Sequence, residues 1–334
     1  MLFITNRSLN EGKDSKVNRK ISFNLKDSEP SASAFFCSRK KKDDYVELMS
    51  AGFFEKLRRS SCEQILLYIH GFNNFPEKDI FPRAQTLQEL CDREKKGRVQ
   101  VVPMIWPCDT DFGVIKDYWD DQDAAEASAV GFARVFGLFL KWRDERTRQD
   151  PCYKRINLIS HSMGNRVLRF TLAAWASDYG AAPAIFRNIF MAAADIANES
   201  LEPGKPGQHI QKAARNVVVY FANDDFALRS SKITNLKNKV VSRRLGHTGP
   251  ENPERVGTNV YSIDCDDFNN TYDRPTGHAY FLRDNKGKPG SVFKHMWRAM
   301  DVGRVDCDPQ TRSLILPKTY SPPSGKPKTK KAKQ

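Results

Sequence analysis

Short apolar runs recur along the chain, and segments with helical spacing separate most of them. The runs are rich in β-branched and aromatic residues, which favours strands. We expect strands at residues 2–5, 21–25, 64–70, 99–106, 156–160, 185–194, 216–222 and 259–264. Apolar residues at three- and four-residue spacing predict helices at 85–91, 123–142, 165–175, 226–240 and 291–300. This alternation predicts an α/β protein with a mostly parallel central sheet of about eight strands and helices on both faces.

The segments between these runs predict how the chain is organised. No helical pattern separates the first two runs, so we expect them to form an antiparallel edge. Residues 28–33 and 246–257 are rich in Pro, Gly and Ser and are expected to be loops. No internal repeat or linker divides the chain. We therefore expect one domain over residues 1–316 and a tail over 317–334.

The positive charge of the chain is unevenly placed. The formal net charge is +14, and residues 318–334 carry six lysines, three prolines and no acidic residue. Such a segment buries too little apolar surface to order itself, so we expect a disordered basic tail. Solvated charge is the favoured interpretation. An anionic surface, either membrane or nucleic acid, remains a possible partner of the tail.

The cysteines and the amino-terminal segment indicate in which cellular compartment the protein is expected. The seven cysteines are scattered and never form a CxxC pair, which argues against a disulfide framework and a zinc site. No apolar segment of signal-peptide length opens the chain, and the apolar helix at 130–142 is too short to span a bilayer. We expect a soluble, cytoplasmic protein.

The stretch INLISHSMGNRVL, residues 156–168, carries the first chemical signal. A strand runs into Ser162, and a helix is expected to start just beyond it. The small residues Ser160 and Gly164 flank Ser162 at minus two and plus two, which suits the sharp turn of a nucleophile elbow. The general pattern is G-x-S-x-G, and Ser160 replaces its first glycine.

A second strand end can supply donors for a negatively charged oxygen. In LLYIHGFNN the strand ends at His70, and the backbone N–H of Phe72 can point to the same place as the N–H of Met163. Two such donors would form an oxyanion hole. We expect the His70 side chain to be packed as a brace for the loop.

A carboxylate is expected at the end of a later strand. VVVYFANDDFAL ends in Asp224 and Asp225, and a triad needs a carboxylate there to orient a histidine. Asp225 is the preferred acid and Asp224 the alternative, since one of them can cap the following helix. Asp195, at the end of MAAAD, is a weaker candidate.

The general base is expected after the last strand. His278 in TGHAYF follows that strand by a loop long enough to return to the cleft, which gives the chain order Ser, Asp, His. His247 is the rival base. The other histidines of interest are expected to be structural or exposed: His161, His209 and His295.

Taken together, these motifs carry a family resemblance. LFITNR, YIHGFNN, IWPCD, DYWDDQDAAEAS, LISHSMGNRVL, AAADI, YFANDDFALRSS and TGHAYF, in order over residues 2–282, resemble the esterase/lipase-like α/β-hydrolases grouped as a family of unknown function. The resemblance implies an α/β-hydrolase fold. It also implies the site residues: Ser162 as nucleophile, Asp225 as acid, His278 as base, and Phe72 and Met163 as oxyanion donors.

The chemistry expected of such a site is acyl transfer through an acyl-enzyme. A small-molecule ester or acyl compound is the expected substrate, with no metal and no cofactor. Amides and thioesters would use the same residues. The segments 107–122 and 265–277 are expected to edge the pocket, without a large lid. The rival interpretations are a catalytically silent binding protein of this fold and a protein that binds nucleic acid or anionic membranes through its tail.

Overall fold

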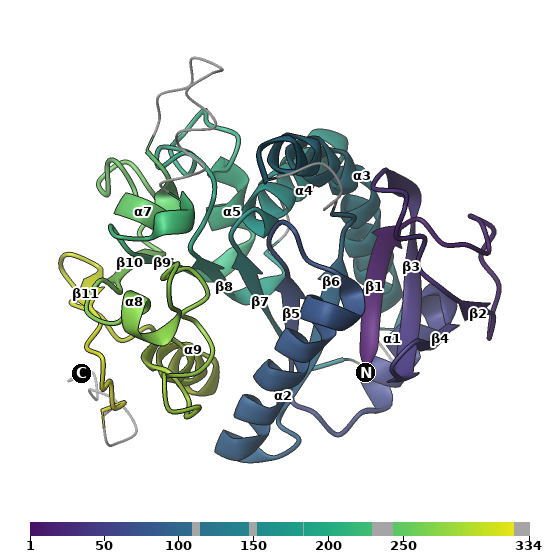
Figure 1. Ribbon diagram of the computed structural model, residues 1–334, viewed down its shortest axis with the longest axis horizontal. Coiled ribbons are helices and arrows are strands. Elements are labelled where there is room, and N and C mark those ends of the chain that lie inside the picture. Colours follow the sequence, from purple (N-terminus) through teal and green to yellow (C-terminus); the bar gives the residue numbers. More distant parts are fainter. Residues whose placement is uncertain (109–113, 147–151, 183, 229–242, 324–334) are drawn as a thin grey trace, which may run out of the picture.

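One eleven-stranded sheet forms the centre of the protein (Figure 1). The computed structural model describes the chain except residues 109–113, 147–151, 183, 229–242 and 324–334, and except the side chains of 114–119 and 145–146. The strands are β1 (Leu2–Arg7), β2 (Lys20–Ile21), β3 (Pro30–Lys41), β4 (Asp44–Glu47), β5 (Gln64–Ile69), β6 (Val99–Ile105), β7 (Arg155–His161), β8 (Phe186–Ala192), β9 (Ala214–Phe221), β10 (Val260–Asp264) and β11 (Ser313–Ile315). Their order across the sheet is β11-β10-β9-β8-β7-β5-β6-β1-β3-β4-β2.

The parallel part of the sheet matches the expectation, and the edges differ from it. From β11 to β1 all neighbouring strands are parallel. The antiparallel edge exists, but β1 pairs with β3 and not with the second predicted run. β3 begins at Pro30, inside the segment 28–33 that was expected to be a loop. The buried apolar residues of β3 are Phe35, Phe36 and Cys37. The rest of the strand is mostly small, polar or cationic, so the sequence shows no long apolar run there.

Helices cover both faces of the sheet. They are α1 (Met49–Arg59), a π-helical turn η1 (Pro76–Ile80), α2 (Phe81–Lys95), α3 (Val114–Arg146), α4 (Gly164–Tyr179), α5 (Gln208–Lys212), α7 (Leu245–Thr248), α8 (Asn269–Tyr272) and α9 (Ser291–Val302). α1, α3 and α4 pack on one face, and α2 and α9 pack on the other (Figure 1). Of the helix expected at 226–240, residues 226–228 are helical and the rest lies outside the described residues. None of the described helices combines the length and apolar character needed to cross a bilayer.

The packed part of the chain extends past the predicted boundary at residue 316. Tyr320 is only 7% exposed, and its hydroxyl donates to Asp306 Oδ2 at 2.6 Å. Its backbone N–H donates to Ser291 Oγ at 3.1 Å. The packed part therefore continues at least to Tyr320, which contacts Ser291 of α9, and the division of the chain into a domain and a tail stays a prediction. Residues 324–334 lie outside the described part, where the basic tail stays a prediction.

Candidate active site

Ser162 lies in a sharp turn between β7 and α4. Its φ is +53°, a backbone conformation that residues other than glycine rarely adopt. The Ser162 N–H donates to the Ala192 carbonyl at the end of β8, at 3.0 Å. The Asn165 side chain donates to the carbonyls of Ser160 and Ser162 at 3.1 and 3.0 Å. Hydrogen bonds to the end of β8 and from the Asn165 side chain thus hold this strained turn in place.

The small residues around Ser162 are explained by close packing. A Cβ on Gly164 would lie 2.9 Å from the carbonyl oxygen of Ile69 and closer still to that of His70. Only glycine lets α4 start this near the end of β5. Ser160 is fully buried and pairs with Ile69 and Met191 in the neighbouring strands. Its small side chain fits where the general pattern has a glycine.

Asp225 and His278 are joined directly. The Nδ1 of His278 lies 2.7 Å from Oδ2 of Asp225. Asp225 is fully buried, and its Oδ1 accepts the N–H of Leu228 at 3.0 Å. Burial disfavours the charged imidazolium, but the Asp225 carboxylate, together with the charges of Asp273 and Asp195, outweighs that effect, so the pKa of His278 is raised above its ordinary value. A base in this environment is oriented by the carboxylate and stabilised when it takes up a proton.

The alternative acids have other partners. Asp224 accepts hydrogen bonds from the side chains of Asn269, at 2.6 Å, and Asn270. Asp195 is buried in ion pairs with Arg244 at 3.1 Å and Arg166 at 3.8 Å. Of the three carboxylates, Asp225 is the one that the structure brings to His278. The rival base His247 lies in α7, where its backbone N–H donates to the Arg244 carbonyl at 2.9 Å.

His161 connects the turn at Ser162 to His278. Its Nε2 lies 3.2 Å from the backbone oxygen of His278, and the two ring centroids are 4.8 Å apart. Because His161 directly precedes Ser162, this contact brings the His278 loop against the turn. Its expected structural role is compatible with its burial, but the sequence did not indicate the contact with His278. Asp273 Oδ2 accepts the backbone N–H groups of His278 and Ala279, both at 2.8 Å, and fixes the same loop.

The loop after β5 lies against Ser162. A Cβ on Gly71 would be 3.0 Å from the Ser162 Cβ. Asn74 Nδ2 donates to the carbonyls of Gly71 and Phe72 at 2.9 and 2.6 Å, which fixes the orientation of both peptide groups. Met163 directly precedes α4. Within the described residues, no backbone carbonyl outside the regular elements accepts its N–H. The assignment of the Phe72 and Met163 amides as oxyanion donors stays a prediction.

His70 is the brace that the sequence predicts. The ring is fully buried and stacks on Trp106 with centroids 5.1 Å apart. Its Nδ1 lies 2.7 Å from the Gly71 oxygen, and its Nε2 accepts the Trp106 backbone N–H at 3.2 Å. Burial lowers the pKa of His70 to about 3, so the ring stays neutral and fixes the turn.

The expected rim of the site is only partly described. Of residues 107–122, the backbone of 109–113 and the side chains of 114–119 lie outside the described residues. Asp121 at the start of α3 is buried and accepts the Asn73 N–H at 3.1 Å, which ties α3 to the loop after β5. In the described part of the chain, no three His, Cys, Asp or Glu side chains gather as a metal site would require.

Two solved structures of the phospholipase PlaB from Legionella pneumophila, one in complex with thio-NAD, resemble the chain at 17% and 14% identity, with TM-scores of 0.25 and 0.27. The matches cover 63% and 65% of this chain, which spans 40% and 41% of the length of those chains. No curated protein sequence matches the chain.

The family match covers most of the chain. The alpha/beta hydrolases of unknown function (DUF900) match residues 48–288, which contain β5 to β10 and the turn at Ser162. With its parallel sheet, its helices on both faces and this match, the chain belongs to the alpha/beta hydrolases of unknown function (DUF900).

Proposed function

We propose that the protein is a serine hydrolase that cleaves carboxylic esters through an acyl-enzyme on Ser162. The observation that carries the proposal is the 2.7 Å hydrogen bond between His278 and the buried Asp225. The backbone of His278 also contacts His161, the residue that precedes the strained Ser162. This arrangement supports the nucleophile, base and acid roles expected of a triad.

The proposed reaction assigns one step to each of these residues. His278 Nε2 takes the hydroxyl proton as Ser162 Oγ bonds to the ester carbonyl carbon, and the carbonyl oxygen becomes negatively charged. The backbone N–H groups of Phe72 and Met163 stabilise that oxygen. His278 then gives its proton to the departing alkoxide, which leaves as an alcohol. A water molecule repeats the attack on the acyl group, so that the acid is released and Ser162 regains its proton.

The test is hydrolysis of matched substrates with one acyl group and three leaving groups. We expect p-nitrophenyl esters to be cleaved faster than the corresponding anilides, and thioesters are assayed beside them. Ser162→Ala should lower kcat by about 10⁴-fold or more. Ser160→Ala is the matched control, because this serine lies two residues away and is fully buried in β7. It should retain activity.

The outcomes separate the candidate functions. Loss of ester cleavage in Ser162→Ala, with Ser160→Ala active, supports the proposal. A folded wild-type protein that cleaves none of the three substrate classes would contradict it and favour a binding protein of the same fold. Faster cleavage of amides or thioesters would contradict the ester assignment and keep the nucleophile.

A further inference from the structure

A short loop joins β5 to the π-helical turn η1 and places its backbone beside the candidate nucleophile. A Cβ on Gly71 in this loop would lie 3.0 Å from the Cβ of Ser162. The carbonyl of Gly71 and the N–H of Phe72 belong to one peptide group, and this peptide bond is trans. In a planar trans peptide the two bonds point in opposite directions. A contact that fixes the Gly71 carbonyl therefore also fixes the direction of the Phe72 N–H.

Two side chains donate hydrogen bonds to the Gly71 carbonyl. Nδ1 of His70 lies 2.7 Å from this oxygen, and Nδ2 of Asn74 lies 2.9 Å from it. Because Nε2 of His70 accepts the Trp106 N–H, the proton of the neutral ring is on Nδ1 and is donated to Gly71. A carbonyl oxygen has two lone pairs, and these two donors use both. The thiol of Cys108 adds a weaker contact at 3.6 Å.

The next peptide group of the loop is held at both ends. Nδ2 of Asn74 also donates to the Phe72 carbonyl, at 2.6 Å, and the N–H of Asn73 donates to Oδ2 of Asp121 at 3.1 Å. Asn73 has a φ of +54°, in the left-handed region. One side-chain amide, that of Asn74, thus joins two consecutive carbonyls of a strained loop and holds them in one arrangement.

Arg83, in the first turn of α2, determines which way the Asn74 amide faces. The guanidinium of Arg83 donates to Oδ1 of Asn74. Since a guanidinium has donors and no acceptor, the amide oxygen faces Arg83 and the amide nitrogen faces the two carbonyls. The hydrogen bond is charge-assisted and therefore stronger than a neutral one. Asn74 is only 5% exposed, so its amide is held among these partners.

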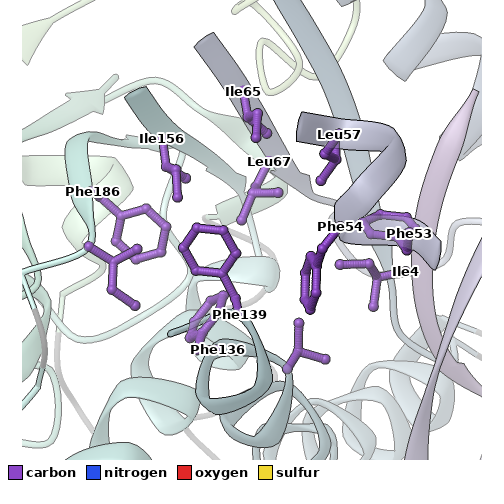
Figure 2. Close-up of a pocket in the computed structure, with 12 residues that line it drawn as sticks. Ile4, Phe53, Phe54, Leu57, Ile65, Leu67, Phe136, Phe139, Ile156 and Phe186 are labelled. Carbon is purple, nitrogen blue, oxygen red and sulfur yellow. The ribbon is translucent and has the colours of Figure 1, made fainter. Parts of the chain in front are cut away.

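The strand that leads into the loop is fixed by packing. Ile65 and Leu67 of β5 lie beside Phe54 of α1 and Phe139 of α3 in one apolar cluster (Figure 2). A backbone donor on a loop that is clamped by side chains and continues from a packed strand has a defined direction. Stabilisation of a developing negative charge requires such a donor, set in place before the reaction.

We propose that Asn74 and Arg83 are positioning residues of the oxyanion hole. Arg83 orients the Asn74 amide, and that amide aims the Phe72 N–H at the oxygen that becomes negatively charged when Ser162 attacks. The inference rests on the proposed hydrolase function. Both side chains act through the peptide group between Gly71 and Phe72 and not by contact with the substrate. The oxygen carries its charge in the transition state, so their loss should lower kcat and leave KM nearly unchanged.

The test is a double-mutant cycle on the full chain with a p-nitrophenyl ester. Asn74→Ala removes the donor to both carbonyls and should lower kcat about ten- to hundredfold, less than the roughly 10²–10³-fold lost with an oxyanion donor itself. Arg83→Met removes the group that orients the amide and should lower kcat about three- to tenfold. The double variant should lose no more than Asn74→Ala alone, because Arg83 acts through Asn74.

A transition-state analogue gives a second measurement. When Ser162 Oγ bonds to the carbonyl carbon of an alkyl trifluoromethyl ketone, its proton passes to His278 and the carbonyl oxygen becomes negatively charged in the hole. The inhibition constant should rise in each variant by the factor by which kcat/KM falls. The midpoint of the pH profile of kcat/KM should stay in place, because the hydrogen bond between Asp225 and His278 is kept.

Two further variants separate positioning from a general effect on the fold. Arg83→Lys keeps a charged donor and should recover part of the activity lost in Arg83→Met. The matched control is Arg93→Met, which removes an exposed arginine from the same helix and should retain the wild-type kcat. Circular dichroism checks that each variant is folded. Arg83→Met carries the test if Asn74→Ala does not fold, and a wild-type kcat in Arg83→Met would then overturn the proposal.

The outcomes are distinct. Losses in kcat that are not additive, matched by weaker ketone inhibition, support the positioning roles. Additive losses would overturn the role of Arg83, because its charge would then act independently of Asn74. A folded Asn74→Ala variant with the wild-type kcat, or with its loss confined to KM, would overturn the inference and leave the proposed function standing. A wild-type chain that cleaves no ester would overturn both.

Discussion

The Nε2 of His161 lies 3.2 Å from the backbone oxygen of His278, so the residue before Ser162 contacts the residue that would act as its base. Burial, and then the charge of His278, hold the pKa of His161 well below its ordinary value. The neutral ring therefore carries its proton on Nε2 and donates it to the His278 carbonyl. This hydrogen bond positions the backbone of the base.

Replacing His161 should therefore affect the rate more than substrate binding. His161→Phe keeps an aromatic ring and removes the donor, and we expect kcat to fall about three- to tenfold, the value of one hydrogen bond of about 0.5–1.5 kcal/mol. KM should change little. His161→Gln keeps a side-chain N–H and should recover part of the loss. Steady-state kinetics with a p-nitrophenyl ester measures both values. A larger effect on KM than on kcat would contradict the positioning role.

The pH dependence of kcat/KM should report His278. The base must be neutral to accept a proton, and its pKa is raised by Asp225, so activity should increase with pH through a midpoint above about 6.5. Asp225→Asn removes the largest of the charges that raise the pKa of His278, and only the weaker effects of Asp273 and Asp195 then oppose burial. The midpoint should then move to lower pH, and kcat should fall by roughly 10⁴-fold. An unchanged midpoint in the folded variant would mean that another group controls the profile.

Glycine at position 164 should stabilise the fold. Gly164→Ala forces a Cβ against the carbonyls at the end of β5, so we expect the free energy of unfolding to fall by about 1–3 kcal/mol. The matched control is Gly52→Ala in α1, where a Cβ would meet only Leu48 at 3.8 Å. That change should stabilise the protein by about 0.5–1 kcal/mol. Urea unfolding distinguishes the two; equal effects of the two changes would argue against the close approach.

Tyr320 should stabilise the domain. Its ring is buried and its hydroxyl bonds to Asp306, so Tyr320→Ala should lower the free energy of unfolding by about 2–4 kcal/mol. Tyr153 offers a control, because it is 86% exposed and its replacement by alanine should have almost no effect. Thermal unfolding measures both variants. Equal midpoints would show that residues 317–320 behave as part of the tail.

The parallel strands could be predicted because helices cover both of their faces. β9, for example, is buried on both sides, and its sequence ends in the continuous apolar run VVVYF. β3 and α1 lack that signal. In α1 the buried Phe53, Phe54 and Leu57 stand among exposed or charged residues, and only packing against the rest of the fold selects the helix.

The site could be predicted only as far as strand ends define it. Ser162 and Asp225 follow strands whose carboxyl ends lie at the same edge of a parallel sheet, and the Asp225 side chain lies within hydrogen-bond distance of His278. The contacts of His161, Asn74 and Asp273 depend on how separate loops pack against each other. No spacing in the sequence encodes those contacts.

The most direct test of the central claim is covalent labelling with a fluorophosphonate, followed by peptide mass spectrometry. The probe reacts with activated serines, and the account predicts one label per chain, on Ser162 and not on Ser160. Labelling should disappear in Ser162→Ala and His278→Ala while circular dichroism shows both variants folded. A folded wild-type chain that stays unlabelled, or a label on any other serine, would contradict the assignment of Ser162 as the nucleophile.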